Sequence, residues 1–180
     1  GNEDAKRAVV NQWRMNKSSG TYLFYGKKGA YLKEFALAFA KGINCNESVH
    51  DFCDKCRVCE NINKEIYSDL HIISASEGTV KIDQIRELIK NASETSYEMG
   101  KKVFIIEDVN KLRKEASNAL LKIIEEPPKD TYFILLANSL NILPTIKSRS
   151  LAIEIQKLTY EELGVEESLY NFFLGDVKDI

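Results

Sequence analysis

Apolar residues along the chain fall into two patterns. Largely apolar runs occupy residues 22–25, 70–73, 103–106 and 132–137, and apolar and polar residues alternate at 151–155. The longer stretches between these runs carry apolar residues every three or four positions. Continuous runs are typical of buried parallel strands, and the longer period is typical of amphipathic helices. The alternation of the two predicts an α/β fold in which helices cover both faces of a parallel sheet.

The helical period also suggests where the main domain ends. Pro127-Pro128 stops one predicted helix sharply, because proline cannot continue a helix. Thr159-Tyr-Glu-Glu162 matches a capping box, which marks the start of another. We therefore expect one domain over residues 1–158 and the beginning of a small helical domain over 159–180. The period predicts earlier helices at about 2–16, 30–41, 82–92 and 111–126.

Residues 21–41 have the strand, glycine loop and helix order of a phosphate-binding P-loop. In the pattern G-x-x-x-x-G-K-[ST], Gly26 matches the first glycine. The second glycine then falls on Tyr31, the lysine on Leu32 and the hydroxyl residue on Lys33. A P-loop needs the lysine for the β- and γ-phosphates and the hydroxyl for magnesium. We therefore predict the scaffold of a nucleotide site without its chemistry.

Gly26, Lys27, Lys28 and Gly29 form the remnant of this loop, and ATP is not expected to bind there. An alternative stays open at this point. The chain would be an active ATPase with an unusual P-loop if a displaced lysine, such as Lys28 or Lys33, took over the phosphate role.

Glu107 and Asp108 follow the apolar run at 103–106. Carboxylates at the end of such a strand resemble a Walker B site, which holds the metal and orients water. The usual order is aspartate then glutamate, and here it is reversed. A structural interpretation is nearly as good, because buried strands often end in a solvated acidic residue.

Cys45, Cys53, Cys56 and Cys59 are spaced C-x7-C-x2-C-x2-C and are the chain's four cysteines. Two-residue gaps let neighbouring thiolates turn toward one centre, and four thiolates complete a tetrahedral zinc site. We therefore predict a structural zinc module inserted at 45–59. Four reduced cysteines without metal, or an iron–sulfur cluster, are the alternatives, although the spacing fits a cluster poorly.

Composition narrows the function classes. The 180 residues carry a net charge of −2, which gives no sign of a strongly basic nucleic-acid surface. In the cysteine segment, Lys55 and Arg57 are offset by four acidic residues, which argues against a DNA-reading zinc module. No apolar run approaches the roughly 20 residues that cross a bilayer, and the first residues do not resemble a signal peptide. We expect a cytoplasmic protein with no membrane partner.

Residues 101–128 resemble the most distinctive segment of bacterial clamp-loader AAA+ subunits of DNA polymerase III. Asn118–Lys122 reads Asn-Ala-Leu-Leu-Lys and Glu125–Pro128 reads Glu-Glu-Pro-Pro, as in that family. Ile142–Ser150 is similar to the family's L-P-T-I-R-S-R-C motif, with Ser150 in place of the cysteine. The four-cysteine insertion fits as well. The resemblance spans about residues 2–159.

The resemblance implies an AAA+ fold with a helical lid domain after it, in the N-terminal part of such a subunit. It implies that Arg149 is offered in trans to the ATP of a neighbouring subunit, and that Asn138 stands at the sensor position. The family contains motor subunits and a companion whose P-loop is often degenerate, and the chain is similar to the companion. The implied partners are other clamp-loader subunits, and the sliding clamp and primer-template DNA through the assembled complex.

Overall fold

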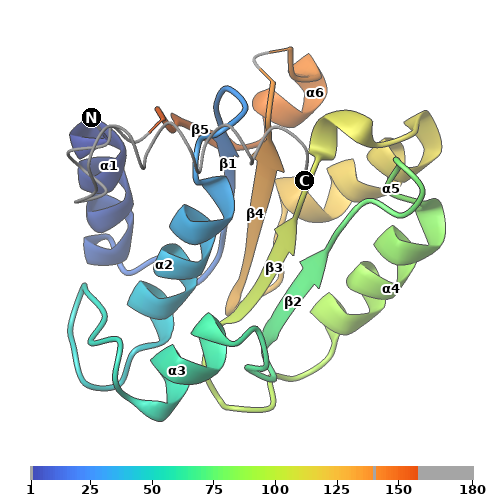
Figure 1. Ribbon diagram of the computed structural model, residues 1–180. Coiled ribbons are helices and arrows are strands. Elements are labelled where there is room, and N and C mark those ends of the chain that lie inside the picture. Colours follow the sequence, from blue (N-terminus) through green and yellow to red (C-terminus); the bar gives the residue numbers. More distant parts are fainter. Residues whose placement is uncertain (1, 140, 158–180) are drawn as a thin grey trace.

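The computed structural model describes residues 2–139 and 141–157. The helical domain expected from residue 159 lies outside the described residues. Helices and strands alternate along most of the chain (Figure 1). In chain order the elements are α1 (Glu3–Arg14), β1 (Gly20–Tyr25), α2 (Leu32–Asn44), α3 (Arg57–Asn63), β2 (Leu70–Ile73), α4 (Ile82–Ser93), β3 (Lys102–Ile106), the 3₁₀ turn η1 (Val109–Lys111), α5 (Lys114–Glu125), β4 (Thr131–Ala137), α6 (Pro144–Lys147) and β5 (Leu151–Glu154).

The five strands form one parallel sheet in the order β2-β3-β4-β1-β5. β1 lies between β4 and β5, with Gly20 opposite Tyr132 and Tyr22 opposite Leu151. Every residue of β3 and of β4 is buried. The predicted parallel sheet is therefore confirmed.

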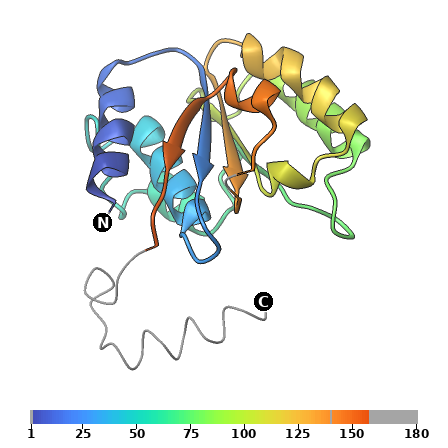
Figure 2. The same cartoon turned by 90° about the horizontal axis from the view of Figure 1, so that it is seen from above.

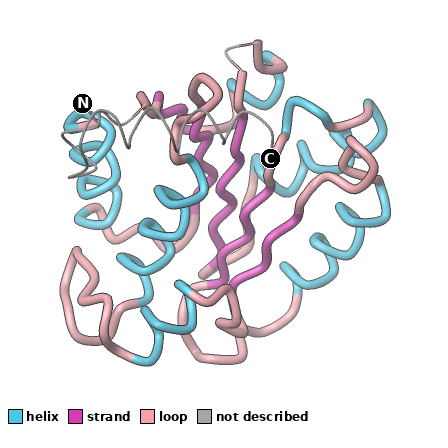
Figure 3. Tube along the Cα trace, in the orientation of Figure 1, coloured by secondary structure: helices cyan, strands magenta, loops and turns pink. Residues whose placement is uncertain are grey.

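Each face of the sheet packs against its own set of helices (Figure 3). Along β1, Phe24 joins the core under α1, α2 and α3, whereas the preceding Leu23 joins the core under α4 and α5. Successive side chains of a strand point to opposite faces, so continuous apolar runs are needed when both faces are covered. The prediction of helices on both faces is confirmed.

One predicted helix start was wrong. The helix expected from residue 111 begins at Lys114, because the chain first makes the short turn η1. Asp108 has left-handed backbone angles (φ 52°, ψ 45°), and the Lys111 N–H donates to its carbonyl at 2.7 Å. Leu112 is then extended before α5 starts. The pattern predicted neither α3 nor α6, whose seven and four residues are too short to show a period.

The topology separates two ends of the sheet. The glycine loop, the acidic pair and Asn138 all follow the carboxyl ends of strands. Arg149 instead lies between α6 and the start of β5. Figure 2 shows α6 and the start of β5 at the opposite end of β1 from the loop that follows it. The features predicted from the sequence therefore belong to two different surfaces.

Candidate functional site

Gly26 and Gly29 keep the geometry of a tight loop after β1. A Cβ on Gly26 would lie 2.3 Å from the carbonyl oxygen of Ile155, so only glycine fits there. Gly29 has φ +91°, which L side chains rarely adopt. The Gly26 N–H donates to the Ala137 carbonyl at 3.1 Å, which ties the loop to the end of β4. The order of strand, glycine loop and helix predicted from the sequence is present.

Leu32, at the P-loop lysine position, is a core residue. Its exposed fraction is 4%, and it packs in the cluster between α2 and the sheet. It is the first residue of α2, and Tyr31 before it makes no side-chain cap. An apolar side chain turned into the core cannot reach a phosphate. Lys27 and Lys28 are exposed on the loop.

Lys33, at the hydroxyl position of the motif, makes ion pairs within the chain. Its Nζ lies 2.8 Å from Glu65 Oε1 and 3.7 Å from Glu107 Oε1. Partial burial disfavours the ammonium, but the hydrogen bonds and charges of the two carboxylates outweigh it and raise the pKa of Lys33. A cation therefore stands beside the acidic residue that would hold a metal in a Walker B site.

A hollow of about 240 Å³ lies at this end of the sheet, below the roughly 300 Å³ where ligand pockets usually begin. Its lining includes Leu32, Lys33, Glu107, Asp108 and Asn138. The hollow thus brings together Glu107, Asp108 and Asn138, whereas the predicted loop residues 26–29 are not part of its lining. Leu32 and Lys33 line the hollow where a P-loop has its lysine and its hydroxyl residue.

Both acidic residues already have partners. Glu107 accepts a hydrogen bond from the Ser74 hydroxyl, besides its ion pair with Lys33. Asp108 Oδ2 lies 3.4 Å from Lys111 Nζ. Two carboxylates that each face a lysine are poorly placed to bind a divalent cation, because the ammonium groups already balance their charge.

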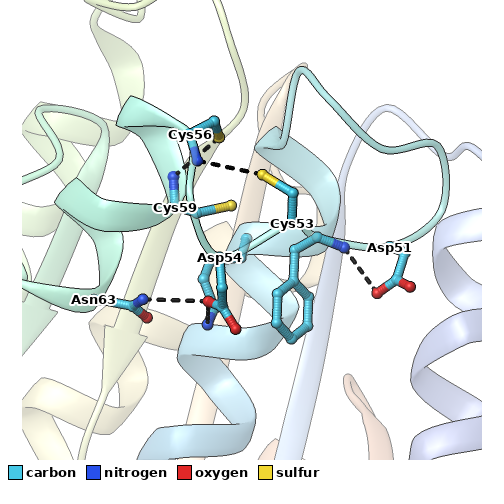
Figure 4. A network of polar contacts seen from close by, with 8 residues as sticks. Asp51, Cys53, Asp54, Cys56, Cys59 and Asn63 are labelled. Atoms are coloured by element: carbon cyan, nitrogen blue, oxygen red, sulfur yellow. Dashed lines mark hydrogen bonds and ion pairs between the residues drawn. The ribbon is translucent and has the colours of Figure 1, made fainter.

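The four cysteines form one cluster, and three of them are seen in Figure 4. Their Sγ atoms all lie within 4.8 Å of one another. The N–H groups of Cys56 and Cys59 point at the Sγ atoms of Cys53 and Cys56, at 3.3 and 3.5 Å. Zinc bound by four thiolates at about 2.3 Å places the sulfur atoms about 3.8 Å apart. The donor set and its spacing fit a closed zinc site.

The pKa values of two thiols in the cluster, Cys53 and Cys59, are shifted in opposite directions. The N–H of Lys55 and further hydrogen bonds lower the pKa of Cys53 to about 7, and the burial of the thiol, which would raise it, is outweighed. Burial raises the pKa of Cys59 to about 12. A nearby cation favours the thiolate form, so metal binding would deprotonate the buried Cys59. His50, inside the same segment, is exposed and takes no part in the cluster.

The cysteine segment is fastened to the helices beside it. Lys41 of α2 pairs with Asp54, and its ammonium also lies 4.2 Å from the centre of the Phe52 ring. Phe52 in turn meets Trp13 of α1 edge to face, with ring centroids 6.3 Å apart. The hydrogen bond from Lys41 lowers the pKa of Asp54 despite some burial. The segment therefore packs on α1 and α2 as well as around its own cysteines.

Arg149 lies between α6 and the start of β5, away from the glycine loop and the acidic pair. Its Nε donates to Glu125 Oε2 at 3.3 Å, and its Nη1 donates to the Thr145 carbonyl at 3.0 Å. The Thr21 hydroxyl donates to the Ile124 carbonyl at 2.7 Å, which places the end of α5 beside the beginning of β1. The glycine loop is five residues further along β1, about 16 Å at 3.3 Å per residue. Arg149 therefore lies toward the beginning of β1, and the glycine loop follows the end of that strand.

Two partners were not predicted from the sequence. Glu65, which pairs with Lys33, follows α3 with a left-handed φ of 58°, and nothing in the sequence pattern points to it. Glu125 belongs to the Glu-Glu-Pro-Pro segment, which signals the end of a helix but not the contact with Arg149. Such contacts join segments 24 or more residues apart and depend on the fold.

Among the described residues, no helix is both long and apolar enough to cross a membrane.

The five-stranded parallel sheet in the order β2-β3-β4-β1-β5, with helices on both faces, gives the chain an AAA+-like fold. Residues 1–159 match the family described as "DNA polymerase III, delta subunit", and the chain belongs to that family.

Curated relatives carry related names. The chain is 35% identical to the DNA polymerase III subunit delta' of Bacillus subtilis, over 84% of the chain and 46% of that protein. It is 33% identical to the DNA polymerase III subunit gamma of Buchnera aphidicola, over 92% of the chain and 44% of that protein. The chain thus spans less than half the length of these two relatives, and about a quarter of the length of several others.

Solved structures support the fold. A DNA polymerase III gamma subunit-related protein from Thermotoga maritima aligns with a TM-score of 0.64 at 21% identity, covering 98% of this chain and 57% of that one. The clamp loader delta protein of Bacillus subtilis aligns with a TM-score of 0.56 at 17% identity, covering 87% and 44%. Both likenesses concern the arrangement of the elements.

Proposed function

We propose that the chain is part of a clamp-loader subunit of the DNA polymerase III holoenzyme that does not hydrolyse ATP itself. In this role it resembles the relatives named delta'. It contributes Arg149 to the ATP site of a neighbouring motor subunit and helps to load the sliding clamp onto primer-template DNA. Its partners are other clamp-loader subunits, and it works in the cytoplasm, where replication takes place.

The observation that carries the proposal is the pair of residues at the start of α2. Leu32 is buried where a P-loop lysine belongs, and Lys33 pairs with Glu65 and Glu107 instead of leaving room for magnesium. Magnesium and the lysine neutralise the charge that develops on the transferred phosphoryl group. A hollow that has neither a P-loop lysine nor room for magnesium lacks the groups that make hydrolysis fast.

The position of Arg149 supports its role in trans. The side chain is 29% exposed and pairs with Glu125, next to the residue that is tied to the beginning of β1, whereas the loop of its own chain follows the end of that strand. A guanidinium is always charged and can hold two phosphate oxygens at once, so an arginine from a neighbour stabilises the transition state of phosphoryl transfer. Ser150, which replaces the cysteine of the family motif, donates to the Ile146 carbonyl at 2.8 Å and is not needed at the phosphate.

We assign the cysteine cluster a structural role. Cys45, Cys53, Cys56 and Cys59 would hold zinc, which has no redox chemistry and leaves no open position with four thiolates. Zinc would fix a segment that contributes little apolar core of its own and would keep Phe52 against Trp13. The segment would then present a fixed surface beside α1 and α2.

The test is Arg149→Ala in the full-length subunit, assembled with its partner subunits. Steady-state ATP hydrolysis should fall, because such an arginine contributes on the order of 10³-fold to the site it reaches. Arg86→Ala is the matched control, since Arg86 is a 70% exposed arginine on α4 whose recorded partner, within the part of the chain that the structure describes, is its neighbour Asp83. An unchanged rate with Arg149→Ala would remove Arg149 from this role.

A second candidate is an active ATPase of the motor type. The similar identity to subunits named gamma favours it, as does the position of Lys33 beside the hollow. Calorimetric titration of the full-length subunit with magnesium and ATP separates the two candidates. No heat at millimolar nucleotide supports the non-hydrolysing subunit, and micromolar binding supports the ATPase.

A further inference from the structure

Glu125 holds the side chain of Arg149 from a distant part of the sequence. Its Oε2 accepts a hydrogen bond from Arg149 Nε at 3.3 Å. The two residues are 24 positions apart and come from different elements, α5 and the turn that follows α6. The Glu125 side chain is 59% exposed and that of Arg149 is 29% exposed, so the pair lies at the surface.

The backbone on both sides of this pair is fixed. The end of α5 is tied to the sheet by the buried hydrogen bond from the Thr21 hydroxyl to the Ile124 carbonyl. On the other side, the Arg149 N–H donates to the carbonyl of Ile146 at 3.1 Å, and Ile146 is fully buried. Glu125 and Arg149 therefore project from supports that cannot easily move apart.

The contacts restrain one part of the guanidinium and leave another part open. Nε is held by Glu125, and Nη1 is held by the Thr145 carbonyl at 3.0 Å. Among the described residues, Nη2 has no recorded partner. Arginine loses much rotamer freedom when it is ordered, so a side chain that is ordered beforehand loses less when it meets a phosphate.

We propose that Glu125 is a positioning residue for Arg149, which it orients so that Nη2 faces a phosphate of the neighbouring subunit. The inference rests on the proposed function of Arg149. Its physical basis is orientation: a charged group held near its working position avoids the entropy cost of being ordered during the reaction. Glu125 itself touches no nucleotide, because its carboxylate would repel one.

The experiment is a double-mutant cycle in the assembled clamp-loader complex, with Glu125→Ala, Arg149→Ala and the double variant. We expect Glu125→Ala to lower kcat by about fivefold, a factor within reach of an exposed ion pair. The KM for ATP should not change, because binding at the neighbour does not use Glu125. In the Arg149→Ala background the same substitution should have no further effect.

Two further variants separate positioning from general damage. Glu126→Ala removes the same charge from the next residue, for which the described structure records no ion pair, and should leave kcat unchanged. Glu125→Gln keeps an acceptor for Nε and should restore part of the lost kcat. A Gln variant that is no better than Ala would show that Glu125 acts through its charge and not by orienting Arg149.

The outcomes separate failure of the proposed function from failure of the positioning role of Glu125. If Arg149→Ala leaves hydrolysis unchanged, the proposed function fails. If Arg149→Ala slows hydrolysis but Glu125→Ala does not, or slows it equally in both backgrounds, the function stands and Glu125 is not a positioning residue.

Discussion

Lys33 Nζ lies 3.7 Å from Glu107 Oε1, so an ammonium group of the chain itself stands beside the acidic residue that follows β3. The same ammonium is held more closely by Glu65, at 2.8 Å. A P-loop has a hydroxyl at this position, which would bind magnesium together with a Walker B carboxylate. Here the Lys33 ammonium lies beside Glu107, where a P-loop site would have its magnesium ion. This arrangement leads to the first prediction.

Restoring the P-loop residues should restore nucleotide binding. In the triple variant Tyr31→Gly, Leu32→Lys and Lys33→Thr, the lysine regains its place and Glu107 loses its competing ammonium. We expect the variant to bind magnesium–ATP at submillimolar concentration, measured by calorimetric titration of the full-length subunit. It should also be less stable, since Leu32 is a core residue.

Lys33→Thr alone is the control for this prediction. It frees Glu107 but leaves Leu32 in the core, so it should not bind nucleotide appreciably. Equal binding by the unchanged protein and the triple variant would show that Leu32 and Lys33 do not close the site.

Metal removal should loosen the cysteine segment without unfolding the sheet. Cys56→Ser removes one of four thiolates, and a strong chelator removes the metal itself. We expect about one zinc per chain before treatment and loss of it in the variant, measured by elemental analysis. Hydrogen exchange should rise around 45–59, while the amides of β3 and β4 stay protected because those strands are fully buried.

His50→Ala is the matched control for metal binding, because His50 lies in the same segment but outside the cluster. It should retain its zinc. Loss of cooperative unfolding of the whole domain on chelation would contradict the prediction. Such a loss would mean that the contacts of Phe52 and Asp54 with the helices make the segment part of the central core.

The free energy of unfolding should depend on pH through His71. Its ring stacks on Phe104 with centroids 4.7 Å apart, and burial lowers the pKa of His71 below its usual value of about 6.5. The unfolded chain then binds a proton at a higher pH than the folded chain does. Stability is therefore full above about pH 6.5 and decreases as pH falls from there through the folded pKa, with a slope of at most about 1.4 kcal/mol per pH unit.

The measurement is urea unfolding between pH 7.5 and 5.5 in the presence of excess zinc. His71→Gln should flatten the dependence, whatever it does to the stability at pH 7.5. The chain has two histidines, and the exposed His50 serves as the control, since His50→Gln should leave the slope as it was. An unchanged slope in His71→Gln would assign the dependence to other groups.

The sequence predicted features that depend on local residue types. The mismatch of Tyr31, Leu32 and Lys33 with the P-loop pattern was visible from spacing alone, and the structure shows its physical form in the burial of Leu32. The cysteine spacing predicted a cluster, and the four sulfur atoms do lie together. The zinc itself, like the role of Arg149, stays a prediction.

Other features depend on the fold and could not be predicted in this way. The Lys33–Glu65 pair joins α2 to the end of α3, and α3 is too short to leave a period in the sequence. The sequence predicts a helix start at residue 111, whereas the backbone of Asp108 turns the chain into η1 first and α5 begins at Lys114. Only the packed structure shows such turns and long-range pairs.

Arg149 and the glycine loop lie at opposite ends of β1, so the two sides of the domain that would face neighbouring subunits are not equivalent. Under the proposed function, its arginine side can complete the site of a neighbour, while its loop side offers no site for another neighbour to complete. In a row of subunits that each pass an arginine to the next, such a chain can stand only at the first position. The order of the assembly would then follow from the polarity of this one member.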